Sequence, residues 1–383
     1  MLRIAILGCG KIADQHVHAI HRIPDCQIVA VCDRELLMAR QLGERFGISE
    51  YVADLEEMLH ANSPDVVHIT TPPQSHYTLA RKCLEAGSHV YVEKPFSVTA
   101  DEAASLIQLA ERRGLRITAG HNLQFTLEML EMRWLVKGGF LGGKPIHLES
   151  HFSYDLGDTT FVGTLLGNRE HWVRQLPGQL LHNILSHGIA KLAEFLDDDL
   201  EIVAKADQSP RLQSLGGKEI LDELRVLIRD KTGTTAFFCF STQIKGLNQL
   251  RIYGSANSLL VDHASGSIIR ANPRPYKSYL TYFIPPLQSA REHFRNARIN
   301  ITNFLRRRLY QDFGMKELIE RFYDCIRTGG PPPIPYREIL LTARIMDEIF
   351  AQIYPAGKTR EPGHEPIAST LQRTATASPF VTL

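Results

Sequence analysis

The sequence predicts an α/β protein: a doubly wound parallel sheet in the N-terminal half, followed by an α+β half built on antiparallel strands. Three observations support this fold class. Short apolar strands alternate with helices from the N-terminus to about residue 122, which is the pattern of a parallel sheet. A glycine-rich turn directly follows the first strand. Beyond residue 200 several strands follow one another without helices between them, which favours an antiparallel sheet.

The composition is typical of a soluble globular protein. The chain has 383 residues, enough for two domains, of which 44% are hydrophobic and 22% charged. A formal net charge of +1 gives no overall attraction to nucleic acid, so we expect no such partner. No apolar run reaches transmembrane length, and the N-terminus lacks the basic start of a signal peptide. The six cysteines show no metal or redox spacing, so we expect a cytoplasmic protein without a metal site.

The first strand, residues 3–7, leads into a turn with the pattern G-x-G-x-x-A. Gly8 permits a tight turn, Gly10 lets the backbone approach a pyrophosphate, and Ala13 lets the next helix pack close to the strand. The N-terminus of that helix favours phosphate groups. From this turn we predict four residues that bind a dinucleotide: Gly8, Gly10, Lys11 and Ile12.

The second strand, residues 27–32, ends at Asp33, the expected distance downstream for a carboxylate that binds the adenosine ribose. Asp33 disfavours a 2′-phosphate, whereas Arg34 could stack on adenine or tolerate that phosphate. We therefore expect NAD as the cofactor and keep NADP open. The alternative for this pair is an ordinary polar helix start.

The alternation continues with a short helix, a strand and a longer helix: residues 54–60, 66–71 and 75–86. Thr71 and Pro72 form the turn at the carboxyl end of that strand, which is where ligands bind in an open α/β sheet. We therefore include both in the predicted cofactor site. His76, just inside the following helix, is either a cofactor-facing group or a buried structural histidine.

The stretch SHVYVEKPFSVT holds the most informative residues of the chain. Its strand, residues 89–92, ends in Glu93, Lys94 and a proline, so both charges lie at the ligand-binding edge of the sheet. A helix over 99–113 and a strand over 116–119 then lead to Asn122. We assign Glu93, Lys94 and Asn122 to the cofactor crevice. The alternative is a strand end with a solvated ion pair.

The second half contains one apolar helix between strands, and two helices close it. Predicted strands cover residues 146–154, 201–207, 224–229, 234–242 and 250–253, with a hairpin turn at 230–233. Predicted helices cover residues 126–136, 180–196, 315–328 and 337–353. The tail from residue 355 is rich in Pro, Gly, Ser and Thr, and we expect it to be disordered.

Together, the G-x-G-x-x-A turn, the acid after the second strand, Thr-Pro-Pro-x-x-His, A-G-x-H-V-x-x-E-K-P and G-x-N resemble the glucose-fructose oxidoreductase/inositol dehydrogenase/MocA (Gfo/Idh/MocA) family. The resemblance covers the N-terminal half closely and the rest in outline. It implies a Rossmann domain, residues 1–122, and an α+β domain with a large, open, mostly antiparallel sheet, residues 123–354. In this family that sheet commonly mediates dimers or tetramers, so we expect a homodimer or homotetramer.

The resemblance also identifies the helix at residue 180 as the second catalytic element. The family pattern G-G-G-x-x-x-D-x-x-x-H places His187 at the histidine and Asn183 at the acid. The two lie one turn apart on one face, so they can meet one substrate. We assign proton exchange to His187, stabilisation of the reacting oxygen to Lys94, and its orientation to Asn183. The alternative is a core helix with a satisfied histidine and asparagine.

Two further segments have recognition residues. Arg169, His171, Trp172 and Arg174 precede that helix and could bind a sugar ring and an anionic group, or form a packed loop with an anchoring Trp. The segment 270–310 is basic and aromatic. It could clamp an anionic or nucleotide-linked substrate, contact an acidic membrane surface, which we do not expect, or be a solvated helix at an oligomer edge.

The resemblance and these residues predict an NAD(P)-dependent oxidoreductase that transfers a hydride to or from a sugar-like or polyol substrate. Two alternatives use the same fold. A glycosidase or epimerase-like enzyme would retain NAD and oxidise its substrate transiently, with no net cofactor turnover. A non-catalytic regulator would only sense NAD. Lys94 and His187 argue against the regulator, whereas Asn183 argues mildly for it.

Overall fold

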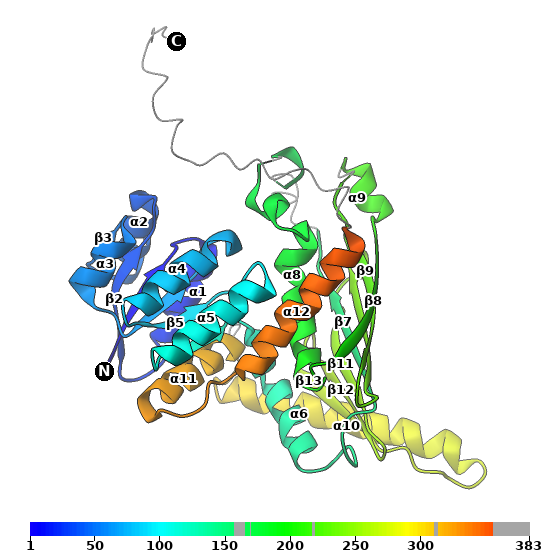
Figure 1. Cartoon of the computed structure of the whole chain (residues 1–383). Coiled ribbons are helices and arrows are strands. Elements are labelled where there is room, and N and C mark those ends of the chain that lie inside the picture. The colour runs from blue at the N-terminus through cyan, green and yellow to red at the C-terminus, as the bar shows by residue number, and fades with distance from the viewer. Residues whose placement is uncertain (157–164, 169, 217–218, 310–312, 355–383) are drawn as a thin grey trace, which may run out of the picture.

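The computed structural model describes residues 1–156, 165–168, 170–216, 219–309 and 313–354. It has two halves, each built around one sheet (Figure 1). Arg169 and the predicted disordered tail, residues 355–383, lie outside the described residues. Among the described helices, none is long and apolar enough to cross a membrane.

The first sheet is a six-stranded parallel sheet of the Rossmann type, as the sequence predicts, with the strand order β3-β2-β1-β4-β5-β6. Its strands are β1 (Leu2–Leu7), β2 (Cys26–Cys32), β3 (Tyr51–Val52), β4 (Val66–Ile69), β5 (His89–Val92) and β6 (Ile117–Ala119). The strands are apolar runs because helices cover both faces. The strand order reverses between β1 and β4, and in open α/β sheets ligands bind beyond the carboxyl ends of the strands at such a point.

The helices of this half are α1 (Lys11–Ile20), α2 (Leu36–Phe46), α3 (Leu55–Asn62), α4 (His76–Glu85, after the short helix η1, Pro73–Ser75) and α5 (Ala100–Arg112). Side-chain caps start two of them. Asp54 accepts a hydrogen bond from the amide of Glu57, and Thr99 accepts one from the amide of Glu102. The sequence analysis did not predict α2 or the two-residue β3, which is too short for a periodic pattern.

The second sheet has seven strands in the order β13-β12-β11-β7-β10-β9-β8, and it is antiparallel except for the pair β7 and β10. Its strands are β7 (His147–Ser153), β8 (Leu200–Asp207), β9 (Glu223–Asp230), β10 (Thr235–Ser241), β11 (Asn248–Tyr253), β12 (Ser258–Asp262) and β13 (Ser267–Ala271). The predicted mostly antiparallel sheet is therefore confirmed. Strands β12 and β13 were not predicted, and in each of them only two or three consecutive apolar residues stand between polar ones.

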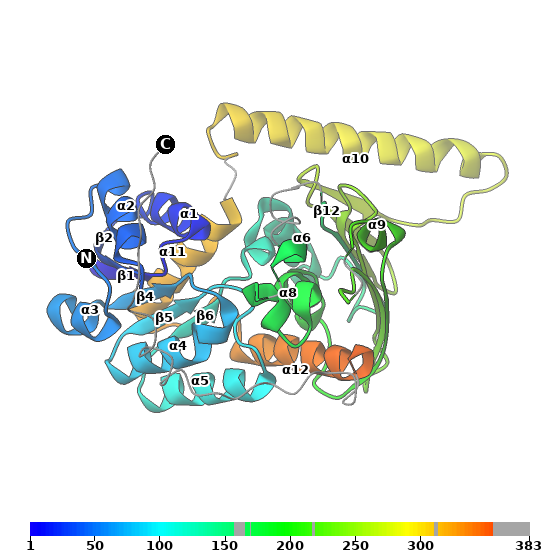
Figure 2. The same ribbon diagram turned by 90° about the horizontal axis from the view of Figure 1, so that it is seen from above.

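One face of the second sheet is covered by α6 (Leu127–Lys137), α8 (Gln179–Ala193) and α12 (Tyr336–Ile353), which lie between it and the first half (Figure 2). Helix α8 packs so closely that a Cβ on Gly188 would lie 2.3 Å from the ring of Phe238 on β10. This packing buries α8 almost completely and fixes which of its side chains face the first half.

The last two helices connect the halves. Helix α11 (Phe313–Thr328), which the sequence analysis assigned to the second domain, inserts its apolar side chains into the core of the first half. Among them is Phe322, which packs near Tyr91 of β5, with 6.3 Å between ring centroids. The division at residue 122 stays a prediction.

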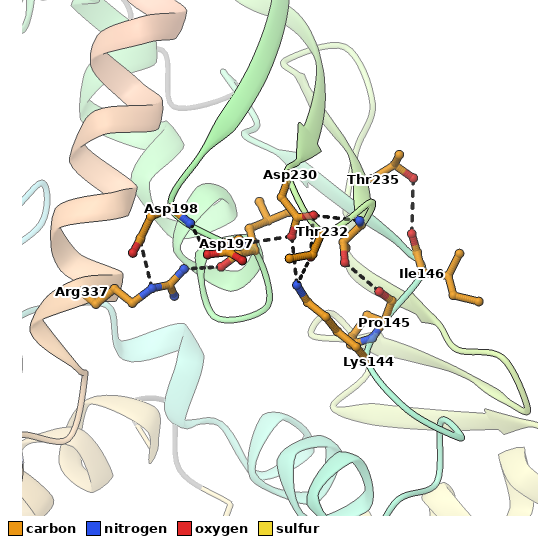
Figure 3. Close-up of polar contacts among 11 residues, drawn as sticks. Lys144, Pro145, Ile146, Asp197, Asp198, Asp230, Thr232, Thr235 and Arg337 are labelled. Carbon is orange, nitrogen blue, oxygen red and sulfur yellow. Dashed lines mark hydrogen bonds and ion pairs between the residues drawn. The ribbon is translucent and has the colours of Figure 1, made fainter.

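A polar cluster at the turn between β9 and β10 anchors the end of α8 (Figure 3). Buried Asp230 accepts hydrogen bonds from the amide of Thr234 at 2.8 Å and from the amide of Asp197, beyond α8, at 3.1 Å. Arg337 of α12 contacts Asp198 at 3.0 Å. The hairpin and α12 thus fix the position of the helix that carries Asn183 and His187.

Candidate active site

The turn after β1 has the geometry that a phosphate-binding turn requires. Gly8 has a φ of +99°, and a Cβ there would lie 2.7 Å from the side chain of Thr71, so only glycine fits. A Cβ on Gly10 would meet nothing within 4 Å, which leaves open space beside the start of α1. No side chain caps this helix. The first amide groups of a helix have no acceptor one turn earlier in the same helix, so the start of α1 suits a pyrophosphate.

Asp33 holds this turn from the neighbouring strand. One carboxylate oxygen accepts a hydrogen bond from the amide of Cys9 at 2.7 Å, and the other accepts one from the amide of Glu35 at 3.0 Å. A carboxylate has about four lone-pair positions, so capacity remains for ribose hydroxyls. Arg34 lies next to it and is exposed. Burial, then Asp33, raises the pKa of the Cys9 thiol to about 12, so this cysteine stays protonated.

Glu93 is the acceptor end of a buried chain of hydrogen bonds. Its carboxylate lies 3.0 Å from Nε2 of His16, Nδ1 of His16 lies 2.9 Å from Nδ1 of His68, and Nε2 of His68 lies 2.8 Å from the hydroxyl of Tyr323 on α11. Neutral imidazoles satisfy every bond if Tyr323 donates to His68, His68 to His16, and His16 to Glu93. This chain fixes the loop that carries Lys94.

Glu93 keeps its negative charge although it is buried. Burial alone would raise the pKa of Glu93, but the hydrogen bond from His16 and the nearby Lys94 outweigh it, and the net pKa is lowered. Burial lowers the pKa of His68 far below its ordinary value and raises that of Tyr323. The anion is thus confined beside Lys94.

Lys94 reaches from the first half to the second. Its Nζ donates a hydrogen bond to the main-chain carbonyl of Asn183 on α8 at 3.2 Å. Burial lowers the pKa of Lys94, and Glu93 partly offsets the effect. Two of the three ammonium hydrogens remain for other acceptors. The structure therefore places the lysine and the helix of the predicted catalytic pair together.

His187 lies one turn beyond Asn183, and both side chains are half-buried. Within the described part of the chain, Nδ1 of His187 is buried and has no hydrogen-bond partner. Burial, followed by the charges of Lys94, His121, Lys191 and His263, lowers its pKa far below the ordinary value. His187 is therefore a neutral base near neutral pH.

His121, after β6, is a site residue that the sequence analysis missed. It is buried, and within the described residues neither ring nitrogen has a hydrogen-bond partner. Burial lowers its pKa to about 4. The side-chain oxygen of neighbouring Asn122, which the sequence analysis assigned to the cofactor crevice, also has no partner among these residues. Unpaired buried polar groups are rare in proteins, so this group is suited to a polar ligand.

A second set of ionisable groups lies behind His187. Lys191, one turn further along α8, is fully buried, donates to Oδ1 of Asn248 at 2.8 Å, and has its pKa lowered by burial to about 7. His263 contacts Glu128 of α6 at 2.7 Å. Sequence analysis missed this set, although a lysine on the apolar face of a core helix is itself unusual.

The other predicted cofactor residues lie after three different strands: Lys11 and Ile12 after β1, Thr71, Pro72 and His76 after β4, and Asn122 after β6. His76 is fully buried, and its ring nitrogens lie 2.8 Å from the carbonyl of Thr71 and 2.9 Å from that of Pro95. It links the loops after β4 and β5 through main-chain contacts. Lys11 and Ile12 form the first turn of α1, and Pro72 precedes η1.

The predicted substrate loop lies close to the first half. Trp172 and Arg174 are half-buried in a short helix, η3 (Trp172–Gln175), and the ring of His171 stacks on Trp172. The side-chain amide of Gln74, on η1, donates to the main-chain carbonyl of Trp172 at 2.6 Å. Among the described residues, no group of three His, Cys, Asp or Glu could hold a metal ion.

Comparison with known proteins agrees with this geometry. Residues 2–121 match the family model described as "Oxidoreductase family, NAD-binding Rossmann fold". D-glucoside 3-dehydrogenase of Escherichia coli is 37% identical over 143 residues, which is 37% of this chain and 40% of the relative. D-apiose dehydrogenase of Paraburkholderia graminis is 25% identical over 90% of this chain and 86% of its own. The chain thus spans two fifths of the first relative and most of the second.

Solved structures match the whole fold. The WlbA dehydrogenase of Bordetella pertussis, in complex with NADH and UDP-GlcNAcA, has a TM-score of 0.72 and 17% identity, over 92% of this chain and 95% of that one. An oxidoreductase of Agrobacterium radiobacter, in complex with NAD+, L-tartaric acid and magnesium, has a TM-score of 0.72 and 16% identity, over 92% and 96% of the two chains. At 16–17% identity, the structural similarity shows that these proteins share the fold with its two sheets, and no more.

Proposed function

This chain belongs to the Gfo/Idh/MocA family of oxidoreductases, and from that membership we propose that it is an NAD(P)-dependent dehydrogenase or reductase of a sugar-like or polyol substrate. The observation that carries the proposal is the contact of Lys94 with the main chain of Asn183. It brings the lysine of one half to the helix that holds His187, directly beside the crevice of an NAD-binding sheet.

The first half has residues that fit the dinucleotide. The open space at Gly10 and the uncapped start of α1 suit the pyrophosphate. Asp33, already fixed by two main-chain amides, suits the adenosine ribose and disfavours a 2′-phosphate. We therefore favour NAD over NADP. Arg34 is the residue that would tolerate NADP.

The bound cofactor supplies a hydride acceptor or donor at the nicotinamide ring. The ammonium of Lys94 donates to the reacting oxygen and stabilises the negative charge that develops on it during oxidation. Neutral His187 accepts the hydroxyl proton, and in the reverse direction it returns that proton. Lys94 and His187 are both half-buried, so the surrounding protein strengthens their electrostatic effect on the reacting oxygen.

Asn183 takes the position of the family's acid and has no charge. Its side chain orients the substrate oxygen but does not ionise. A carboxylate there would favour the imidazolium form of His187 and raise its pKa. We infer that the pKa of His187 is lower with Asn183 than it would be with a carboxylate at this position. His187 therefore stays neutral to a lower pH.

The charges near His187 indicate the class of substrate. Lys191, whose pKa is lowered to about 7, is cationic in weakly acidic solution, and Lys94 adds a second nitrogen donor. The acids Glu93 and Glu128 are each engaged by a histidine. A substrate rich in hydroxyl oxygens, with or without an anionic group, suits this surplus of donors. Half-buried Trp172 offers a flat surface for a sugar ring, with Arg174 beside it.

The proposal is tested with a panel of sugars, polyols, glycosides and nucleotide sugars. NAD or NADP is present, and the reduced cofactor and the keto product are measured together. We expect at least one substrate to give equal amounts of both. Product formation without net cofactor reduction would favour the NAD-retaining alternative. Cofactor binding with no reaction across the panel would favour the regulator.

A further inference from the structure

Helix α10 (Leu280–Leu305) stands apart from both cores. It runs along one side of the molecule as a straight bar, and its N-terminal end extends past the second sheet (Figure 2). Of the residues in this 26-residue helix, only Asn296 is buried. Helices of globular proteins normally bury an apolar stripe, so the attachment of α10 to the body needs explanation.

Helix α10 is attached by its polar side. Asn296 makes two hydrogen bonds with the main chain of Ile268 in the edge strand β13, at 2.8 and 3.2 Å. Glu292 forms an ion pair with Arg270 of the same strand at 2.7 Å, and Arg295 forms one with Glu131 of α6. These contacts cover the edge of the sheet and leave the opposite side of α10 facing solvent.

The exposed side of α10 is a continuous apolar stripe. Two series of positions, each spaced by seven residues and offset by three, form one face of the helix. The first series is Leu280, Leu287, Phe294 and Ile301, and the second is Phe283, Ala290, Ala297 and Phe304. Phe294 is 78% exposed and Phe304 70% exposed. Exposed apolar surface on this scale marks an interaction site.

The charges beside the stripe are almost all positive. Residues 270–310 contain nine Lys or Arg and one acid, Glu292, which is engaged on the inner side. Exposed Arg291 and Arg298 flank the stripe, and exposed Arg306, Arg307 and Arg308 follow its end. A cavity of about 570 Å³ at that end is lined by Arg22, Phe304, Leu305, Arg307 and Leu309. Its apolar side chains and the guanidinium of Arg307 suit an anionic amphiphile.

The charge decides between two occupants of the stripe. Pairing with a second copy would bring the Arg291 and Arg298 flanks of both helices together, and like charges at such positions oppose pairing. An anionic lipid surface offers the opposite charge and an apolar interior. We propose that α10 is an interfacial helix that lies on an anionic bilayer, with its apolar stripe among the acyl chains and its arginines on the lipid phosphates.

The proposal is tested by flotation of the full chain with vesicles. One set is pure phosphatidylcholine, and the other contains roughly one third phosphatidylglycerol, because anionic lipid supplies the attraction. We expect binding to the anionic vesicles only, weakened by high salt. The double variant Phe294→Asp, Ile301→Asp should lose binding at least tenfold. The double variant Arg291→Glu, Arg298→Glu should weaken vesicle binding roughly twenty-five-fold or more, since each Arg contributes about fivefold to the affinity.

A matched control is Trp134→Asp, which places the same charge on another exposed aromatic, 72% exposed on α6, and should keep vesicle binding. Unchanged NAD binding and thermal unfolding show that each variant is folded. Failure of the full chain to float with anionic vesicles overturns the proposal. Retained flotation of the Asp double variant does so too. If that variant instead changes the mass measured by light scattering and no form floats, a second copy covers the stripe.

Discussion

The ammonium group of Lys94, on the loop after β5, donates a hydrogen bond to the main-chain carbonyl of Asn183 on α8 at 3.2 Å. This bond connects the parallel sheet to the antiparallel half at the point where the chemistry is proposed. A carbonyl inside a helix is fixed by the helix itself, so the bond holds Lys94 without requiring a carboxylate partner from α8.

The first prediction concerns Lys94. Lys94→Met keeps the apolar stem but removes the donor, so kcat should fall roughly a hundredfold or more while the Kd for NAD stays nearly constant. Stopped-flow kinetics and calorimetry measure the two quantities. The matched control is Lys82→Met on α4, where the side chain is exposed and paired with Glu56, and its kcat should not change. A Lys94→Met variant that keeps most of its activity would remove Lys94 from the mechanism.

The second prediction concerns Asp33. Asp33→Ala removes the acceptor for the amide of Cys9 and the proposed ribose contact, so NAD affinity should fall roughly tenfold to a hundredfold. NADP affinity should fall less, because the variant no longer repels a 2′-phosphate. Calorimetry with both cofactors measures the gap. Asp33→Asn keeps an acceptor oxygen and should lie between the two forms. Unchanged NAD affinity in Asp33→Ala would refute the ribose assignment.

The third prediction concerns Asn183. The base form of His187 is neutral, so kcat/KM for oxidation rises with pH as the imidazolium loses its proton. Because burial and nearby cations lower the pKa of His187, this rise should lie below its ordinary range. Asn183→Asp places an anion one turn away and should move the rise upward by about one pH unit or more. If the rise stays in place in Asn183→Asp, His187 is not the proton acceptor.

The fourth prediction concerns Lys191. Its pKa falls from 10.5 in the unfolded chain to about 7 in the folded protein, so the unfolded chain binds more protons between these values. Keeping Lys191 protonated therefore lowers the free energy of unfolding by its full amount below pH 7. This destabilisation disappears as the pH rises toward 10.5. Lys191→Met should raise the Tm relative to the parent more at pH 6 than at pH 10, values chosen roughly to bracket that window. A Tm difference that is independent of pH would contradict a lowered pKa of Lys191 in the folded protein.

Local patterns could predict much of the site. Gly8 and Asp33 follow strands at fixed distances, because a dinucleotide imposes one backbone path. Lys94 stands at a strand end, where side chains face the crevice. In each case the information lies within a few residues, and the structure places these residues just beyond the carboxyl ends of β1, β2 and β5.

The sequence could not predict groups that meet across long separations. His68 and Tyr323 are 255 residues apart, and their contact depends on the return of α11 to the first half. A histidine at position 68, inside the apolar strand β4, indicated a buried polar contact. The sequence did not show which residues are its partners. For α10, the helical periodicity is visible in the sequence, yet periodicity does not say which side packs. The structure shows that polar Asn296 faces the protein.

The proposed dehydrogenase activity requires net hydride transfer between substrate and cofactor. The most direct measurement uses an active sugar from the panel with deuterium at the carbon that is oxidised. After turnover with NAD, mass spectrometry of the released cofactor and of the product locates the deuterium. We expect one deuterium in each released reduced cofactor, and the amount of this cofactor should equal that of the keto product. Product that forms while the released cofactor stays free of deuterium would contradict net hydride transfer.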